Sequence, residues 1–115
     1  MAIKEANITI MVKDMDRSIS FYQAIGLTLK NRWADYYAQL TAPGLTIGLH
    51  PGSNTMEPAK TDNISIGFTT DNFEETQSLL QGLSIDVASR QEEGGAFLHF
   101  TDPDGTPLYF IKPKW

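Results

Sequence analysis

Residues 6–27, ANITIMVKDMDRSISFYQAIGL, are the stretch that decides the fold. Isoleucine or valine occupies every second position from Ile8 to Val12, a period that is typical of a strand with one buried face. Asp14 follows at the place of a helix N-cap, and apolar residues then recur every three or four positions until Gly26. The stretch therefore predicts a strand followed directly by a short amphipathic helix.

The same pattern returns in the second half of the chain. Residues Asn63–Thr69 again alternate between polar and apolar side chains, and Asp71 stands before a new apolar series. Asp71 and Glu74 have the spacing of a capping box, in which two side chains satisfy the first free backbone amides of a helix. Gly82 then stands where the helix is expected to end. A second strand and helix are therefore predicted.

Three short strands are predicted after each helix. They are Leu27–Trp33, Tyr36–Thr41 and Leu45–His50 in the first half, and Ile85–Gln91, Ala96–Thr101 and Pro107–Lys112 in the second. Glycine, proline and aspartate mark the turns between them. The order βαβββ thus occurs twice, and an offset of 56 residues pairs Asn7 with Asn63 and Gly26 with Gly82. We predict an α+β protein with modules at 1–50 and 63–115 and a linker at 51–62.

Composition excludes several classes of protein. The chain has 115 residues, of which 41% are hydrophobic, which suits one compact domain over residues 1–115. Its net charge of −5 argues against nucleic acid as a partner. There is no cysteine for disulfides or thiolate chemistry, and no apolar run is long enough for a signal peptide or a membrane helix. A cytoplasmic protein with no membrane partner is expected.

The repeat and its motifs resemble the vicinal oxygen chelate superfamily, which includes glyoxalase, bleomycin-resistance and dioxygenase proteins. The matching motifs are Ile8-x-Ile10-x-Val12-x-Asp14, Ser18-x-x-Phe21-Tyr22, Ile25-Gly26-Leu27 and Phe100-x-Asp102-Pro103-Asp104-Gly105-x-x-Leu108. This resemblance spans essentially the whole chain. It implies tandem βαβββ modules that form a curved mixed sheet around a cleft, with the helices on the outside, and it implies a homodimer.

Alternation along the strands, together with the positions that the resemblance implies, then selects the residues expected to line that cleft. The candidate ligand-binding residues are Asn7, Met11, Trp33, Tyr37, Gln39, Gly48, His50, Asn63, Phe97, His99 and Tyr109. In the repeat alignment Gln39 corresponds to His99, and Tyr37 corresponds to Phe97. The aromatic residues either stack on a flat ligand or only pack, and Tyr109 either donates a hydrogen bond or fills volume.

The resemblance also implies where a metal ion would be held. Metal-dependent members place His or Gln at the start of each module's first strand and Glu in each last strand. Carried over to this chain, those positions are Asn7, Gly48, Asn63 and Tyr109, none of which is a good ligand for a divalent ion. We therefore expect no metal and no cofactor. An alternative is a metal bound by His50 and His99.

The function that follows is capture of a small organic ligand in the cleft without a metal. An alternative is an enzyme of the same superfamily, a lyase, isomerase or dioxygenase similar to lactoylglutathione lyase. Such an enzyme would use the two histidines to bind a metal, or His99 and Tyr109 as acid and base. A third possibility is a non-catalytic subunit or sensor with a protein partner. No catalytic residue is assigned.

Overall fold

The computed structural model describes residues 2–52 and 64–114, and the chain divides into two compact units. The first unit spans Met1–Glu57 and the second spans Pro58–Trp115. The boundary falls within the predicted linker at 51–62, most of which lies outside the described residues. Neither described helix is long and apolar enough to cross a membrane.

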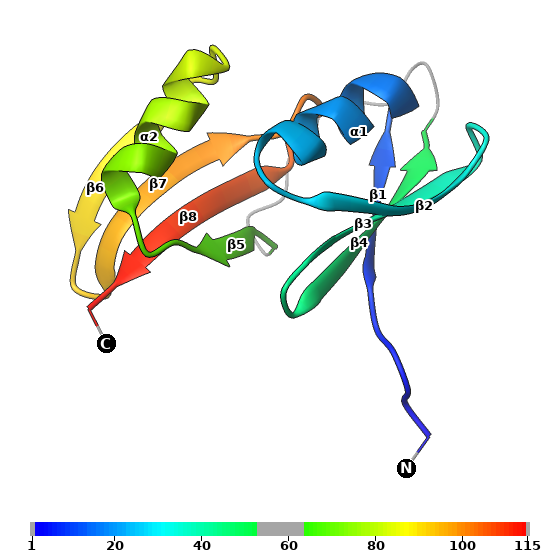
Figure 1. Cartoon of the computed structure of the whole chain (residues 1–115), viewed down its shortest axis with the longest axis horizontal. Helices are drawn as coiled ribbons and strands as arrows, with labels where there is room; N and C mark the ends of the chain where they lie inside the picture. Colours follow the sequence, from blue (N-terminus) through cyan, green and yellow to red (C-terminus); the bar gives the residue numbers. More distant parts are fainter. Residues whose placement is uncertain (1, 53–63, 115) are drawn as a thin grey trace. The chain divides into compact units, whose positions relative to one another are not determined.

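The first unit has the predicted order βαβββ (Figure 1). Its elements are β1 (Ile8–Val12), α1 (Met15–Ala24), β2 (Thr28–Trp33), β3 (Tyr37–Ala42) and β4 (Leu45–Pro51). The strands lie in the order β1-β4-β3-β2, and only β1 and β4 are parallel. Pro51, which the sequence placed in the linker, pairs with Val12 instead. Proline lacks a backbone N–H, so the end of a strand is a position where it is tolerated.

The second unit repeats this topology. Its elements are β5 (Ile66–Thr69), α2 (Phe73–Gly82), β6 (Ala88–Glu92), β7 (Gly95–Thr101) and β8 (Pro107–Pro113), with the strands in the order β5-β8-β7-β6. Again only the first and last strands of the unit are parallel. The strands β5 and β6 begin later than the sequence predicted, at Ile66 and Ala88. The tandem βαβββ prediction is confirmed.

Helix α1 begins and ends where the sequence indicated. The side chain of Asp14 accepts a hydrogen bond from the backbone N–H of Arg17 at 3.1 Å, as an N-cap does. At the other end Gly26 has a φ of 121°, and the N–H of Leu27 donates to the carbonyl of Tyr22 at 2.9 Å. This is the bonding of a glycine-terminated helix, in which the residue without a Cβ adopts the left-handed conformation.

Helix α2 ends at Gly82 as predicted but differs from the prediction in the residues that cap it. Its N-cap is Asn72 rather than Asp71, and Asn72 exchanges hydrogen bonds with Glu75 at 3.0 Å, so Glu74 is not the capping partner. Gly82 is the last residue of the helix but does not have a positive φ; Ser84, two residues later, has a φ of 60° instead. Both aspartate and asparagine are good N-cap residues, so Asp71 and Asn72 were equally suitable for this position.

These differences correct the repeat alignment. Asp14 and Asn72 are both N-caps, and Gly26 and Ser84 both end a helix with positive φ, so each pair is separated by 58 residues rather than 56. Thr9 in β1 and Gly67 in β5, each the second residue of its ladder, are also 58 residues apart, whereas their partners Gly48 and Tyr109 in the last strands are 61 apart. The counterpart of Asn7 is therefore Ser65. Asn63 lies outside the described residues.

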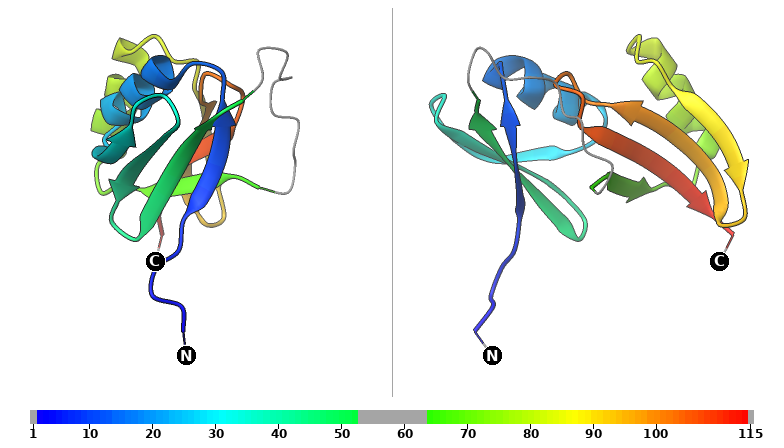
Figure 2. Two further views of the ribbon diagram at one scale, coloured as in Figure 1. Left: turned by 90° about the vertical axis from the view of Figure 1, so that its right-hand side faces the viewer. Right: turned by 180° about the vertical axis from the view of Figure 1, so that it is seen from behind.

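Each helix covers one face of its own sheet (Figure 2). In the first unit Tyr22 and Ile19 of α1 are buried with aliphatic side chains of β3 and β4. In the second unit Leu80 of α2 is buried, as are Leu98 and Leu108 of the strands. The other side of each sheet carries the alternate residues, and we call it the helix-free face. The first residues of the predicted strands, such as Ile8 (40% exposed) and Ile64 (54%), are not buried.

Candidate functional site

The helix-free face of the first unit carries most of the candidate residues of that half. The face holds Thr9, Met11, Trp33, Tyr37, Gln39, Gly48 and His50, all reached by alternation along β1 to β4. The register joins Thr9 to Gly48 and Gly48 to Gln39 in one row across the sheet. Asn7 lies just before β1, and its Oδ1 accepts a hydrogen bond from Thr9 Oγ1 at 3.4 Å. Strand pairing therefore brings amide and hydroxyl groups together.

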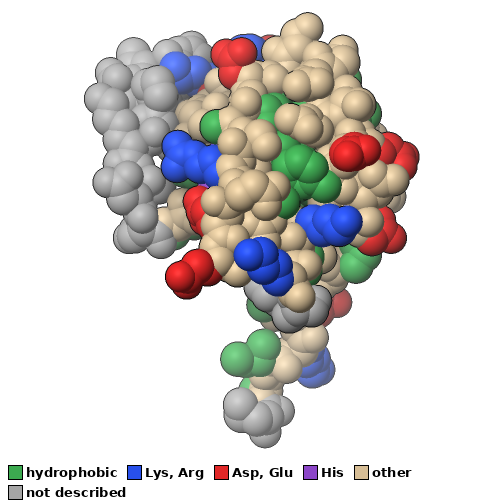
Figure 3. Space-filling view, turned by 90° about the vertical axis from the view of Figure 1, so that its left-hand side faces the viewer, with side chains coloured by type: hydrophobic (Ala, Val, Ile, Leu, Met, Phe, Trp, Pro, Cys, Tyr) green, Lys and Arg blue, Asp and Glu red, His purple; other side chains and the backbone are tan. Residues whose placement is uncertain are grey.

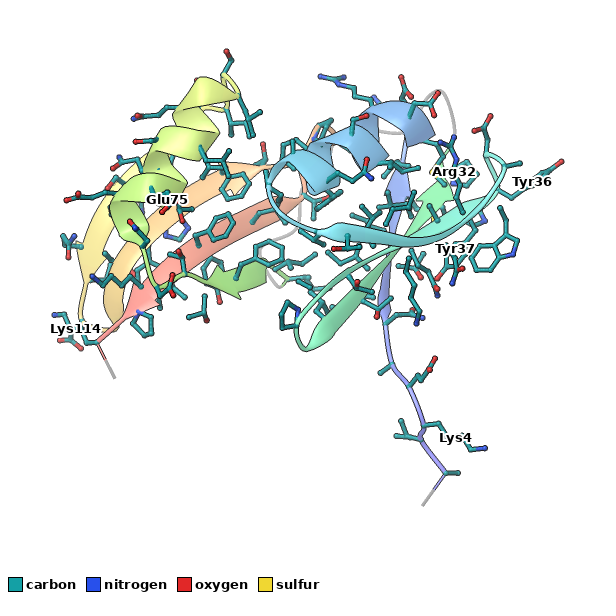
Figure 4. All side chains as sticks on the ribbon, viewed as in Figure 1. Lys4, Arg32, Tyr36, Tyr37, Glu75 and Lys114 are labelled. Carbon is teal, nitrogen blue, oxygen red and sulfur yellow. The ribbon has the colours of Figure 1, made fainter. Side chains whose placement is uncertain are left out.

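Tyr37 is the centre of this face. Its ring stacks on Trp33 with ring centroids 5.6 Å apart and planes 28° apart, and its hydroxyl accepts a hydrogen bond from Gln39 Nε2 at 3.4 Å. The phenol lies over Gly48: a Cβ added there would collide with the Tyr37 hydroxyl and lie 2.8 Å from Thr9 Oγ1. Figure 4 shows Tyr37 on the side of the sheet away from α1. Gly48 is therefore required for the phenol to occupy this position.

His50 is less involved than the sequence suggested. It is exposed, and its Nδ1 lies 2.9 Å from the carbonyl oxygen of Pro51. Because a carbonyl can only accept, Nδ1 carries the proton and donates it in this bond. Only Nε2 then remains to bind a ligand or a metal.

The helix-free face of the second unit is more aromatic. His99 pairs across the ladder with Tyr109, which pairs with Gly67, so these three residues form the row equivalent to the one in the first unit. Phe97 stacks on His99 with centroids 5.5 Å apart and planes 5° apart, and the Tyr109 centroid lies 5.8 Å from Phe97 and 6.0 Å from His99. The Tyr109 ring covers Gly67, where any Cβ would collide with it. The predicted correspondences of Gln39 with His99 and Tyr37 with Phe97 agree with this register.

His99 contains a polar atom that stands out. Its Nε2 is buried and has no hydrogen-bond partner within the described part of the chain. Most buried polar atoms in proteins are paired, because an unpaired one loses the hydrogen bond that water would give it. This nitrogen is therefore a position where a ligand group could form a favourable bond.

Sequence reasoning missed some residues around these faces. A depression of about 330 Å³ in the first unit includes Asn7 and Gln39, and its further lining includes Lys30, Thr41 and Thr46. Alternation from Gln39 to Thr41 and from Gly48 to Thr46 was the signal that could have found the two threonines. Alternation had placed Gly67 towards the cleft, but it was not chosen as a ligand-binding residue, although a glycine inside a strand often marks a close approach by another group.

A larger depression, of about 650 Å³, lies in the second unit away from the candidate residues. Its lining includes Asp71 and Glu74 near the start of α2 and Lys112 and Lys114 at the end of β8. In the space-filling view, hydrophobic side chains form a small patch among interspersed Asp, Glu, Lys and Arg side chains (Figure 3). The charges on that view are mixed, so the net negative charge of the chain is not concentrated there.

The residues present do not fit the metal site that the resemblance implied. The Gly48 position offers no side chain, and the space beside it is filled by the Tyr37 phenol. At Tyr109 a phenol stands where a carboxylate would be needed. Residues 2–52 and 64–114 also contain no group of three His, Asp or Glu side chains placed to hold an ion.

Comparison with known proteins identifies a family for most of the chain. Residues 6–110 match the family model described as the glyoxalase/bleomycin resistance protein/dioxygenase superfamily. No curated protein matches the chain.

Solved structures match the fold at low sequence identity. A bleomycin-binding protein complexed with bleomycin has a TM-score of 0.74 at 21% identity, with 97% of this chain and 100% of that chain covered. The bleomycin resistance determinant of transposon Tn5 has a TM-score of 0.76 at 20% identity, with 98% and 100% covered. A fosfomycin resistance protein from Listeria monocytogenes has a TM-score of 0.80 at 20% identity, with 99% and 96% covered. At such identities these matches establish a shared fold.

Proposed function

Because the chain belongs to the glyoxalase/bleomycin resistance protein/dioxygenase superfamily, we propose that it binds a small organic ligand on its helix-free faces without a metal ion. One observation carries this proposal: in each unit a tyrosine ring lies over a strand glycine, Tyr37 over Gly48 and Tyr109 over Gly67. Phenols and amides thus occupy the surface where a metal-dependent member would present carboxylates.

The first unit supplies a surface suited to a flat ligand. Trp33 is 51% exposed while its ring stacks on Tyr37, so one large aromatic surface is held in place and still reachable. Small-molecule sites commonly combine apolar walls with a few fixed polar groups, and Asn7 and Gln39 supply such groups here. Stacking on the aromatic pair would provide affinity, and the amides would select the orientation.

The four positions that the resemblance implied for metal ligands carry no carboxylate, which supports a function without a metal there. A divalent ion in an octahedral oxygen site needs several charged or strongly polar ligands. Asn7 and Ser65 offer neutral oxygens, Gly48 offers none, and Tyr109 offers a phenol. Sequestration of a ligand requires no general base, so this donor set is sufficient for the proposed function.

The solved relatives indicate which ligands to test first. One structural neighbour is a complex with bleomycin, a second is a bleomycin resistance determinant, and a third is a fosfomycin resistance protein. We propose bleomycin and other cationic aromatic compounds as probes, because the chain carries a net charge of −5 and an exposed aromatic pair.

The test combines elemental analysis with thermal unfolding. We expect the purified protein to hold no stoichiometric metal and to be stabilised by a compound from this panel equally with and without EDTA, since a ligand of the native state raises its melting temperature. Trp33→Ala should remove most of that shift. Tyr36→Ala is the matched control, because Tyr36 is a neighbouring aromatic residue that is 76% exposed. Stoichiometric metal, or stabilisation that EDTA abolishes, would contradict the proposal.

A second candidate is an enzyme of the same superfamily, and the unpaired His99 Nε2 favours it. A buried imidazole nitrogen beside the Tyr109 ring could exchange a proton with a bound substrate. The same elemental analysis separates two versions of this candidate. Bound metal would support a metal-dependent lyase, isomerase or dioxygenase, whereas chemical turnover of a panel compound without metal, abolished by His99→Phe, would support acid–base catalysis.

We also propose that the protein is a cytoplasmic homodimer. Exposed apolar side chains of the first unit, among them Ile8, Met11 and Trp33, support association. Light scattering at increasing concentration tests the stoichiometry, and a mass equal to one chain throughout would contradict it. The expected location rests on the lack of cysteine and is tested by fractionating cells that express the protein.

A further inference from the structure

The two covering tyrosines are held in different ways. Tyr37 is stacked on Trp33 and accepts a hydrogen bond from Gln39. Tyr109 contacts the rings of Phe97 and His99, but within residues 2–52 and 64–114 its hydroxyl has no hydrogen-bond partner. Among these residues the Tyr109 ring is therefore held by packing, and rotating it away breaks no hydrogen bond within that part of the chain.

The space under the Tyr109 ring has the shape of an aromatic site. Gly67 has no Cβ, and a flat ring from the neighbouring strand fills the volume that this leaves. Phe97 and His99, stacked nearly parallel, form its next wall. His99 brings a buried and unpaired Nε2 to the same cluster. The cluster thus combines a ring-shaped space with one polar atom that lacks a partner.

We propose that Tyr109 occupies a ligand subsite of the second unit, and that a ligand ring displaces it from Gly67 and hydrogen-bonds to His99 Nε2. The chemical class is a flat aromatic ring that carries a hydroxyl or amino group. This inference rests on the proposed function, because it names the ligand chemistry of one of the two helix-free faces. It also explains why a phenol, rather than an aliphatic side chain, covers Gly67.

The probe is p-cresol, which is the side chain of tyrosine as a free molecule. In Tyr109→Ala the vacated space should bind p-cresol and raise the melting temperature. Wild-type protein and Tyr36→Ala should show a smaller shift, because the probe must first displace the Tyr109 ring. Toluene has the same ring without the hydroxyl, so Tyr109→Ala should bind it about tenfold more weakly than p-cresol. Adding His99→Phe should remove this preference, because the ring is kept and the nitrogen is lost.

Two results would overturn the inference. One is a folded Tyr109→Ala protein, checked by circular dichroism, that does not bind p-cresol. The other is a preference for p-cresol over toluene that survives His99→Phe. If p-cresol does not bind while a panel compound still stabilises the wild-type protein in EDTA, this inference fails and the proposed function stands. If p-cresol binds as expected while the wild-type protein holds stoichiometric metal, the proposed function fails and the subsite stands.

A second variant tests the displacement even if Tyr109→Ala does not fold. Gly67→Ala places a Cβ where the Tyr109 ring lies and should force the ring out. His99 should then react several-fold faster with diethyl pyrocarbonate, measured by mass spectrometry. The exposed His50 is the internal reference, since its rate should not change. Unchanged reactivity of His99 in folded Gly67→Ala protein would overturn the proposed displacement.

Discussion

The two units share one backbone topology and differ in the side chains on their helix-free faces. In the first unit the central row runs Thr9, Gly48, Gln39, and in the second it runs Gly67, Tyr109, His99. Each face holds a phenol over a glycine, but the tyrosine lies on β3 in one unit and on β8 in the other. The glycine lies on β4 in the first unit and on β5 in the second, so both residues have shifted by one strand across the sheet. The repeat preserves the pairing of a phenol with a glycine on the adjacent strand rather than the residue positions.

The units also differ in how their helices pack. Helix α1 buries Met15, Ser18, Ile19 and Tyr22, whereas α2 buries only Leu80. Leu79 of α2 remains largely exposed. Since burial of apolar area is the main term that holds a helix on a sheet, α1 is expected to be docked more firmly.

Tyr22→Ala should give the largest loss of stability. Tyr22 is 0% exposed and its ring meets Phe21 edge-on, so truncation leaves a large cavity under α1. We expect a cost of about 3–5 kcal/mol in the free energy of unfolding, measured by urea denaturation. Leu80→Ala is the matched truncation in α2 and should cost less. A larger cost for Leu80→Ala would reverse the comparison between the helices.

Asn72→Ala should have a smaller effect. Asn72 Oδ1 accepts a hydrogen bond from the backbone N–H of Glu75, and Asn72 Nδ2 donates a second one to the Glu75 carboxylate. Asp14 likewise accepts a hydrogen bond from a backbone N–H, that of Arg17. Loss of a cap costs about 1 kcal/mol, so we expect the free energy of unfolding, measured by urea denaturation, to fall by that amount in Asn72→Ala. It should fall slightly less in Asp14→Ala. Asp71→Ala is the control and should have little effect on the free energy of unfolding. If Asp71→Ala lost as much stability as Asn72→Ala, the N-cap of α2 would be Asp71, as the sequence predicted.

The position of this cap shows what the sequence could predict of the fold. Element order, strand pattern and the glycine end of α1 followed from local rules, because alternation and capping depend on neighbouring residues. The start of α2 did not, since Asp71 and Asn72 are both good caps and nothing local distinguishes them. The repeated letters Asn7 and Asn63 then suggested an offset of 56, which the sheet registers correct to 58.

The candidate site was predictable to a similar degree. Alternation alone placed Tyr37, Gln39 and His99 on the helix-free faces. The covering of Gly48 by Tyr37 and of Gly67 by Tyr109 depends on side-chain direction across a ladder, which no period in the sequence encodes. The unpaired His99 Nε2 likewise follows from three-dimensional packing.

The smallest expected effect concerns the ion pairs of Arg32, of which the pair with Asp16 joins β2 to α1 and the pair with Asp35 joins β2 to the turn before β3. Arg32 Nη2 lies 2.8 Å from Asp16 Oδ1 and 2.7 Å from Asp35 Oδ1. The hydrogen bond to Asp16, followed in size by the one to Asp35, raises the pKa of Arg32 above its ordinary value. A cation whose pKa is raised in the folded state contributes its full stabilisation at every pH below its pKa in the unfolded chain. That stabilisation is lost only as the pH rises through the pKa of the folded state. This range lies far above neutral pH.

Asp16→Asn should therefore lower the melting temperature by less than Asn72→Ala, and raising the pH from 7 to 9 should not change this difference. High salt should remove the difference in melting temperature between Asp16→Asn and wild-type protein, because exposed ion pairs are screened at high ionic strength. Asp86→Asn, which changes the same charge outside this pair, is the control. A difference that persists in 1 M sodium chloride would mean that Asp16 supports α1 through its backbone position in the first turn rather than through Arg32.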